Sequence, residues 1–259
     1  MSSHRRLADL RASELPGKVS DRSTLVLPLG AIEQHGPHLP YSTDLIVAEA
    51  AGAAVVDAAG DDHDLWLMPS LAYTKSNEHA WNSGTFWISA TTMLAVLDDI
   101  GRSAAATGAK KLALLNGHGG NTALLNVACR EIRLKYGLQT FLMHPMVPPD
   151  HGGTVSGGGE LGMGIHAGLD ETSMILHLRP DLVDMSLAAR HVPEKLAQNK
   201  HVKFGGAVSF GWLSNDFGPE GVIGDPVGAN AALGKQIFDA CVRTLGEAFG
   251  EISRFDFGR

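Results

Sequence analysis

Apolar and polar positions follow two alternating patterns over the first 145 residues of the chain. Short apolar runs predict buried strands at residues 24–29, 65–68, 111–115 and 140–143. Stretches with the spacing of a helix lie between them, at residues 44–59, 89–107 and 122–136. Strands that alternate with helices are typical of α/β proteins. The pattern therefore predicts a mostly parallel sheet with helices on both faces.

The remaining residues carry weaker signals. We expect a short helix within residues 7–15, a helix over 170–178, a further strand within 203–212 and a long closing helix over 226–249. Seven of the 17 residues from 148 to 164 are glycine, and a loop of this length is typically functional or mobile. Because no internal repeat or linker interrupts the pattern, we expect one domain over residues 1–259.

Composition and charge narrow the classes of partner. The 259 residues include 28 acidic and 21 basic side chains, a net charge of −7. No basic stripe indicates nucleic-acid binding, and no apolar run approaches the length of a membrane span. Cys129 and Cys241 lie far apart in helical patterns, which favours buried thiols in a reducing compartment. We expect a cytoplasmic protein with neither a nucleic acid nor a membrane as its partner.

Ionisable side chains gather in the loop that follows the first predicted strand. Glu33 and His35 are two residues apart, so in an extended chain they point the same way. Asp44 stands at the start of a predicted helix, where a carboxylate is electrostatically favoured. Ligands bind at the carboxyl ends of strands in open α/β sheets. These residues are therefore candidate ligands, although a capping aspartate and ordinary polar loop residues would give the same pattern.

Two later loops add to this set. The sequence NGHGGN follows the third predicted strand and places His118 at the same sheet edge. A dinucleotide-binding loop is the rival interpretation, but the glycine order differs from GxGxxG and the nearest later acid, Glu131, lies within a helix. The third loop contains His166, and Glu171 follows it in the first turn of a predicted helix.

The three loops together offer carboxylates and imidazoles but no thiolate. Such donors suit Zn²⁺, Mn²⁺ or Fe²⁺, and a carboxylate that bridges two ions is the usual two-metal arrangement. The candidate residues are Glu33, His35, Asp44, His118, His166 and Glu171. Six other histidines lie outside these and the neighbouring loops and are expected at the surface or in the core: His4, His63, His144, His177, His191 and His201.

The three motifs resemble those of the creatininase family of metal-dependent amidohydrolases. They are EQHGPHLP with Thr43 and Asp44, then NGHGGN at 116–121, then His166-Ala167-Gly168 with Glu171, in the order of the family. The resemblance spans residues 24–185. It implies a three-layer α/β/α sandwich, a hexameric assembly and two divalent ions in each subunit, of which Zn²⁺ is favoured over Mn²⁺ or Fe²⁺.

The resemblance also implies roles for individual residues. Glu33 and His118 would bind one ion and His35 the other, while Asp44 would bridge both ions. His166 would be the acid/base histidine, with a pKa near neutrality. The residues expected beside the substrate are Ser76, Glu78, His79 and Gly119.

The chain departs from the creatinine-hydrolysing enzyme at two positions. Gly120 replaces a glutamate ligand, and Glu171 is our candidate for the missing carboxylate, either as a ligand or as a base. Gly162 replaces a tryptophan that closes the pocket, in a run without aromatic residues. We therefore expect a pocket that differs from that of creatininase proper.

These observations predict a metal-dependent amidohydrolase that acts on a C–N bond of a small substrate, such as a cyclic amide or a formamide. Two alternatives stay open. One is peptide trimming of the type associated with mycofactocin maturation, which occurs within the same family. The other is a non-catalytic protein that holds a metal or metabolite, which the loss of the ligand at Gly120 would favour.

Overall fold

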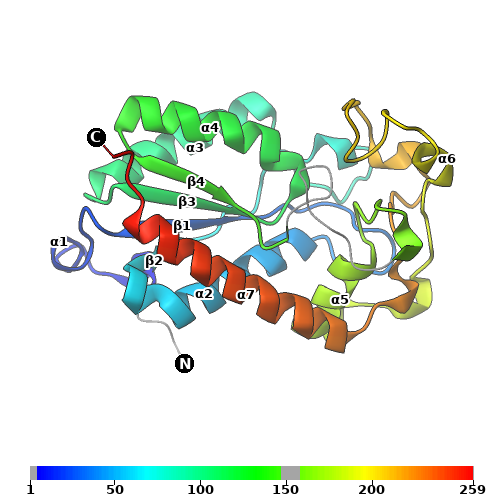
Figure 1. The fold of residues 1–259 in the computed structure, drawn as a ribbon, viewed down its shortest axis with the longest axis horizontal. Coiled ribbons are helices and arrows are strands. Elements are labelled where there is room, and N and C mark those ends of the chain that lie inside the picture. The colour runs from blue at the N-terminus through cyan, green and yellow to red at the C-terminus, as the bar shows by residue number, and fades with distance from the viewer. Residues whose placement is uncertain (1–4, 147–157, 259) are drawn as a thin grey trace.

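The computed structural model describes residues 5–146 and 158–258 and contains a four-stranded, fully parallel sheet (Figure 1). The strand order is β2-β1-β3-β4. The strands are β1 (Thr24–Leu29), β2 (Leu65–Leu67), β3 (Lys111–Asn116) and β4 (Gln139–Met143). All four strands predicted from the apolar runs are therefore confirmed, as is the parallel sheet.

The central strands β1 and β3 are buried at every position, and apolar at all but their end residues Thr24, Lys111 and Asn116, because both faces of the sheet are covered. Leu25, Leu27 and Leu29 of β1 pack into one hydrophobic cluster, whereas Val26 belongs to the cluster on the opposite face. Successive side chains of a strand point to opposite faces. One short run therefore supplies both cores of a three-layer α/β/α sandwich.

Helices form the two outer layers. One face carries α3 (Ala90–Ala106) and α4 (Thr122–Tyr136), and the other carries α2 (Thr43–His63) and α7 (Ala231–Arg254), with α5 (Leu169–Leu178) packed against α7 (Figure 1). The helix predicted for residues 44–59 continues through Gly60 and stops before Asp64, which adopts a left-handed conformation with φ of 50°. The closing helix begins at residue 231, later than predicted, because Pro226–Gly228 form a separate 3₁₀ turn and Asn230 caps α7.

Two sequence-based predictions of local structure are wrong. Residues 7–15 form a 3₁₀ turn (Leu7–Asp9) and the start of the short helix α1 (Leu15–Lys18) rather than one helix. Residues 203–207 form turns and bends, because Gly205 takes a φ of 67° that interrupts an extended chain, and residues 209–212 have no regular secondary structure. Their aromatic side chains pack together instead of pairing in the sheet, next to the short helix α6 (Glu194–Ala197).

The glycine-rich loop predicted at 148–164 lies partly outside the described residues. Its described end contains a 3₁₀ turn, Gly158–Glu160, and the buried side chain of Met163, so this end is packed against the rest of the protein. Cys241 is buried and Cys129 is partly buried, and neither forms a disulfide. Among the described residues, we find no helix that is both long and apolar enough to cross a membrane.

Candidate metal centre

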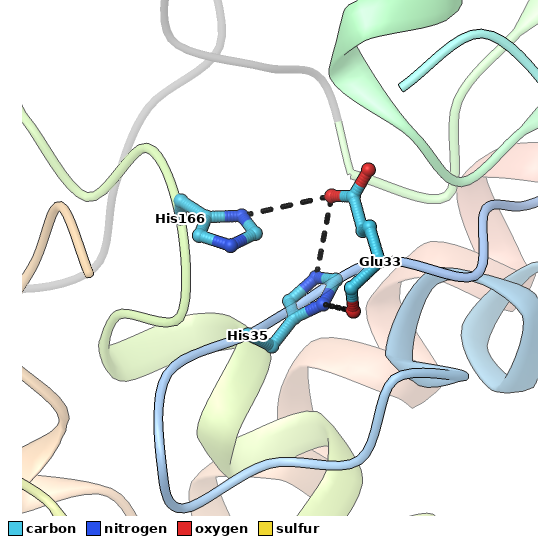
Figure 2. Close-up of side chains that lie close together, drawn as sticks. All are labelled: Glu33, His35 and His166. Atoms are coloured by element: carbon cyan, nitrogen blue, oxygen red, sulfur yellow. Dashed lines mark hydrogen bonds and ion pairs between the residues drawn. The ribbon is translucent and has the colours of Figure 1, made fainter. Parts of the chain in front are cut away.

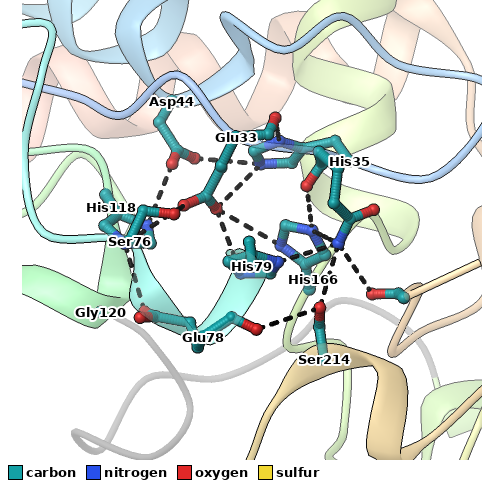
Figure 3. Close-up of polar contacts among 12 residues, drawn as sticks. Glu33, His35, Asp44, Ser76, Glu78, His79, His118, Gly120, His166 and Ser214 are labelled. Carbon is teal, nitrogen blue, oxygen red and sulfur yellow. Dashed lines mark hydrogen bonds and ion pairs between the residues drawn. The ribbon is translucent and has the colours of Figure 1, made fainter. Parts of the chain in front are cut away.

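The six candidate residues converge at the carboxyl-terminal edge of the sheet, and Figure 3 shows five of them: Glu33, His35, Asp44, His118 and His166. Glu33 and His35 follow β1, His118 follows β3, and Asp44 lies in the first turn of α2. His166 precedes α5, and Glu171 lies in its first turn. The parallel arrangement produces this convergence, because it brings the carboxyl ends of β1 and β3 to the same edge.

Glu33 lies at the centre of the cluster, with only 1% of its surface exposed. Its Oε2 lies 3.3 Å from His118 Nε2 and accepts a hydrogen bond from the Ser76 hydroxyl. Its Oε1 lies 3.4 Å from His79 Nε2. A buried carboxylate requires such partners, since burial of an isolated charge is very costly.

The hydrogen bonds of His35 turn one ring nitrogen toward the carboxylates. Nδ1 lies 3.1 Å from the Glu33 carbonyl oxygen. A carbonyl oxygen only accepts, so we assign the proton to Nδ1. The lone pair of Nε2 then faces Asp44 Oδ1, which is 3.2 Å away. A histidine that binds a metal typically donates its other N–H to a carbonyl or carboxylate in this way.

His118 has the same arrangement with its nitrogens exchanged. Nε2 lies 3.1 Å from the Lys75 carbonyl oxygen, so Nδ1 faces Asp44 Oδ2 at 3.1 Å. Apart from this contact, that oxygen is buried without a hydrogen-bond partner among the described residues. In the absence of an ion a proton would hold these two atoms together, and a common cation could take its place.

Three groups of ligand atoms at this edge could hold an ion, since the atoms of each group lie within 4.8 Å of one another. They are Glu33-Asp44-His118, His35-Asp44-Glu171 and Glu33-His35-His166. The first two share Asp44, as a bridging carboxylate between two ions would require. The donor set is thus chemically and spatially suited to two divalent ions.

Electrostatics within the cluster also indicate a site for cations. Burial opposes protonation of His35, but Asp44 and the other carboxylates outweigh it and raise its pKa to about 9. Burial raises the pKa of Glu171 to about 7, and the charge of Asp44 adds to the effect. The carboxylates therefore attract protons onto neighbouring groups, and a bound cation would supply the same positive charge.

His166 presents a single nitrogen to the cluster (Figure 2). Nε2 lies 2.7 Å from the Gln34 carbonyl oxygen, so it carries the proton, while Nδ1 lies 3.8 Å from Glu33 Oε1. Burial and the positive charge of His35 hold the pKa of His166 well below its ordinary value. Without bound ions this imidazole therefore favours its neutral form, and its expected titration near neutrality stays a prediction.

A cavity of about 370 Å³ opens onto the cluster. Phe210 and Trp212 form part of its wall. These aromatic side chains come from the segment interpreted as a strand and not from the neighbourhood of Gly162, where the tryptophan is missing. Glu78, His79 and Gly119 line the cavity as expected of residues beside the substrate, whereas Ser76 is fully buried and binds Glu33.

Sequence reasoning missed two residues that organise the site. Gln34 Nε2 lies 2.8 Å from His79 Nδ1 and 3.2 Å from Ser214 Oγ, and so connects loops that are distant in sequence. Lys75 Nζ donates to Glu78 Oε2 at 2.8 Å. The position of Gln34 between Glu33 and His35 was an available signal, but nothing local indicated what Lys75 contacts.

Comparison with known proteins agrees with this geometry. Residues 8–249 match the family model for creatininase, described as creatinine amidohydrolase. This chain belongs to the creatininase family. Family members are hydrolases, and the carboxylate and imidazole groups described above give this chain the means to bind metal.

Individual relatives differ in the activity that their names give. The mycofactocin precursor peptide peptidase of Mycobacterium ulcerans is 35% identical over 257 residues, covering 94% of each chain. The creatinine amidohydrolase of Pseudomonas putida is 31% identical over 65% of this chain and 69% of its own. A crystal structure of creatininase superposes with a TM-score of 0.76 at 23% identity, covering 98% of this chain and 100% of the other. Solved creatininases include a Mn form and a Zn-Zn type variant.

Proposed function

We propose that this protein is a metal-dependent hydrolase that cleaves a C–N amide bond at a centre for two divalent ions. The observation that carries the proposal is the sharing of Asp44 between two sets of ligand atoms, Glu33-Asp44-His118 and His35-Asp44-Glu171. Zn²⁺ is the favoured ion, with Mn²⁺ or Fe²⁺ as alternatives, since the donors are carboxylates and imidazoles.

The protein groups have distinct tasks in this proposal. When bound, the ions would acidify a water molecule toward neutrality and polarise the amide carbonyl. Glu33 and His118 hold one position, His35 and Glu171 hold the other, and Asp44 spans both. The hydrogen bonds from His35 to the Glu33 carbonyl and from His118 to the Lys75 carbonyl fix the ring orientations before any ion arrives.

His166 is suited to proton transfer. Its Nε2–H is committed to the Gln34 carbonyl, so only Nδ1 can exchange a proton with a substrate in the cavity. It lies 3.8 Å from Glu33 Oε1, at the border between the ligand cluster and the cavity. We propose that Nδ1 accepts a proton from the attacking water and passes it to the departing nitrogen, since a group that transfers a proton must lie within reach of both atoms.

Similarity favours a peptide as the substrate over the small cyclic amide or formamide that the sequence suggested. The mycofactocin precursor peptide peptidase matches nearly the whole chain, whereas the creatinine amidohydrolase matches about two thirds of it. The aromatic side chains of Phe210 and Trp212 suit an apolar or aromatic residue beside the cleaved bond. A small non-peptide amide is the second candidate, since the family includes creatinine amidohydrolases.

A substrate panel with metal analysis tests the proposal. The purified protein is assayed, with and without a chelator, against short peptides with aromatic C-termini, cyclic amides including creatinine, and formamides. We expect about two ions per chain and chelator-sensitive peptide cleavage. Two bound ions with no turnover of any amide would instead support the non-catalytic alternative. Faster turnover of creatinine than of any peptide would refute the peptide assignment.

The assembly and location remain predictions. The family resemblance implies a homohexamer of this 259-residue chain, and a cytoplasmic location is expected from the cysteine usage. Light scattering coupled to size-exclusion chromatography measures the mass directly. A mass of one chain at micromolar concentration would contradict the hexamer.

A further inference from the structure

Gly120 leaves a space in the ligand cluster that another side chain fills. A Cβ atom built on Gly120 would overlap Oε1 of Glu78. Glu78 comes from the loop after β2, more than forty residues earlier in the chain. A side chain at position 120 and the observed position of Glu78 are therefore mutually exclusive, and the structure contains a carboxylate here despite the glycine (Figure 3).

Glu78 is held firmly in this position. It is 7% exposed, and its Oε2 accepts a hydrogen bond of 2.8 Å from Lys75 Nζ. Lys75 Nζ also lies 3.4 Å from the carbonyl oxygen of Gly120, so it joins the two loops. Lys75 has two partners, Glu78 Oε2 and the Gly120 carbonyl, and these restrict its rotation. Lys75 therefore holds Glu78 so that its other carboxylate oxygen, Oε1, points at the ligand cluster.

The second carboxylate oxygen of Glu78 faces a candidate metal ligand. Oε1 lies 3.3 Å from His118 Nε2, the nitrogen that also approaches the Lys75 carbonyl and Glu33 Oε2. The opposite nitrogen, Nδ1, faces Asp44. Among the described residues, none of the three groups that could hold an ion includes Glu78.

We infer that Glu78 is the positioning carboxylate of His118, and that the glycine at position 120 is what admits it. This inference rests on the proposed two-metal function. A carboxylate beside the N–H of a ligating imidazole fixes its tautomer and orientation and makes the opposite nitrogen a better donor, and loss of such a partner typically lowers metal affinity 10–100-fold. Because Glu78 acts only through His118, its effect falls on one ion.

The decisive experiment measures the affinity of each ion in Glu78→Gln. Glutamine keeps the size of the side chain but removes its charge. Wild type and variant are loaded with Zn²⁺ and dialysed against graded chelator, and the metal remaining per chain is measured. We expect one of the two ions to leave the variant at a 10–100-fold lower chelator strength, with the second ion and the circular dichroism spectrum unchanged.

Two further variants separate positioning from a general effect. Glu49→Gln removes the same charge from an exposed position on α2 and is expected to bind both ions like the wild type. In a His118→Ala background, Glu78→Gln is expected to cause no additional loss, because the residue through which it acts is gone.

Three outcomes would overturn the inference: unchanged affinity for both ions in Glu78→Gln, an equal loss of both, or an additional loss in the His118→Ala background. A wild-type protein that retains no ion and cleaves no amide would refute the proposed function itself. The two failures are therefore distinguishable.

Discussion

Replacement of His166 by alanine tests the division between metal binding and proton transfer. The imidazole is 4% exposed, and its ring lies against those of His35 and His79, with centroid separations of 4.3 and 4.2 Å. Its Nε2–H donates to the Gln34 carbonyl, and this bond fixes the tautomer in which Nδ1 faces Glu33. Alanine removes the proton donor but leaves both Asp44-sharing ligand groups complete.

The expected loss follows from the role of a general acid. Such a group typically contributes 10²- to 10⁴-fold, which corresponds to about 2.7–5.4 kcal/mol of the barrier at about 1.36 kcal/mol for each factor of ten. Most of the loss is expected in kcat, because the ligand groups that would hold the ions and the carbonyl are unchanged. His166→Gln, which fills more of the same space, is expected to be equally inactive.

The assay combines turnover with metal analysis on the same samples. Steady-state kcat and KM are measured for the best peptide of the panel, and metal content is determined for each preparation. Loss of an ion from His166→Ala would refute the reasoning, since it would make the third group, Glu33-His35-His166, a true ligand set. Wild-type turnover with both ions present would refute the proton-transfer role.

Other substitutions test the remaining assignments. Asp44→Ala is expected to lose both ions because it removes the carboxylate that the two groups share, and elemental analysis that finds full occupancy would contradict this. Glu171→Gln is expected to weaken one ion selectively with the fold intact; unchanged metal affinity with slower turnover would make Glu171 a base instead. Phe249→Ala in α7 is expected to cost about 3–5 kcal/mol of unfolding free energy, measured by urea denaturation, because Phe249 is fully buried in the hydrophobic cluster that α7 shares with α2 and the sheet. Burial raises the pKa of Cys241 to about 12, so this thiol is expected to resist iodoacetamide at pH 8 until urea unfolds the protein, as mass spectrometry of the labelled chain would show.

The sequence determined the sheet and the candidate ligand set, because both depend on short-range patterns. A strand covered on both faces is apolar at nearly every position, so the runs at 24–29 and 111–115 identified the central strands directly. The candidate ligands Glu33, His35 and His118 follow those strands within a few residues. Because parallel strands end at the same edge of the sheet, residues that follow these strands lie close together there.

The surroundings of the ligands depended on contacts that no local pattern records. The segment 203–212 has the residue types of a strand, yet a left-handed glycine turns it, and Trp212 becomes part of the cavity wall. Local sequence likewise could not indicate that Gly120 makes room for Glu78, because the two residues meet only when the loops after β2 and β3 pack together. The residues nearest the strand ends were therefore predictable from sequence, whereas the residues that orient them were set by packing between distant loops.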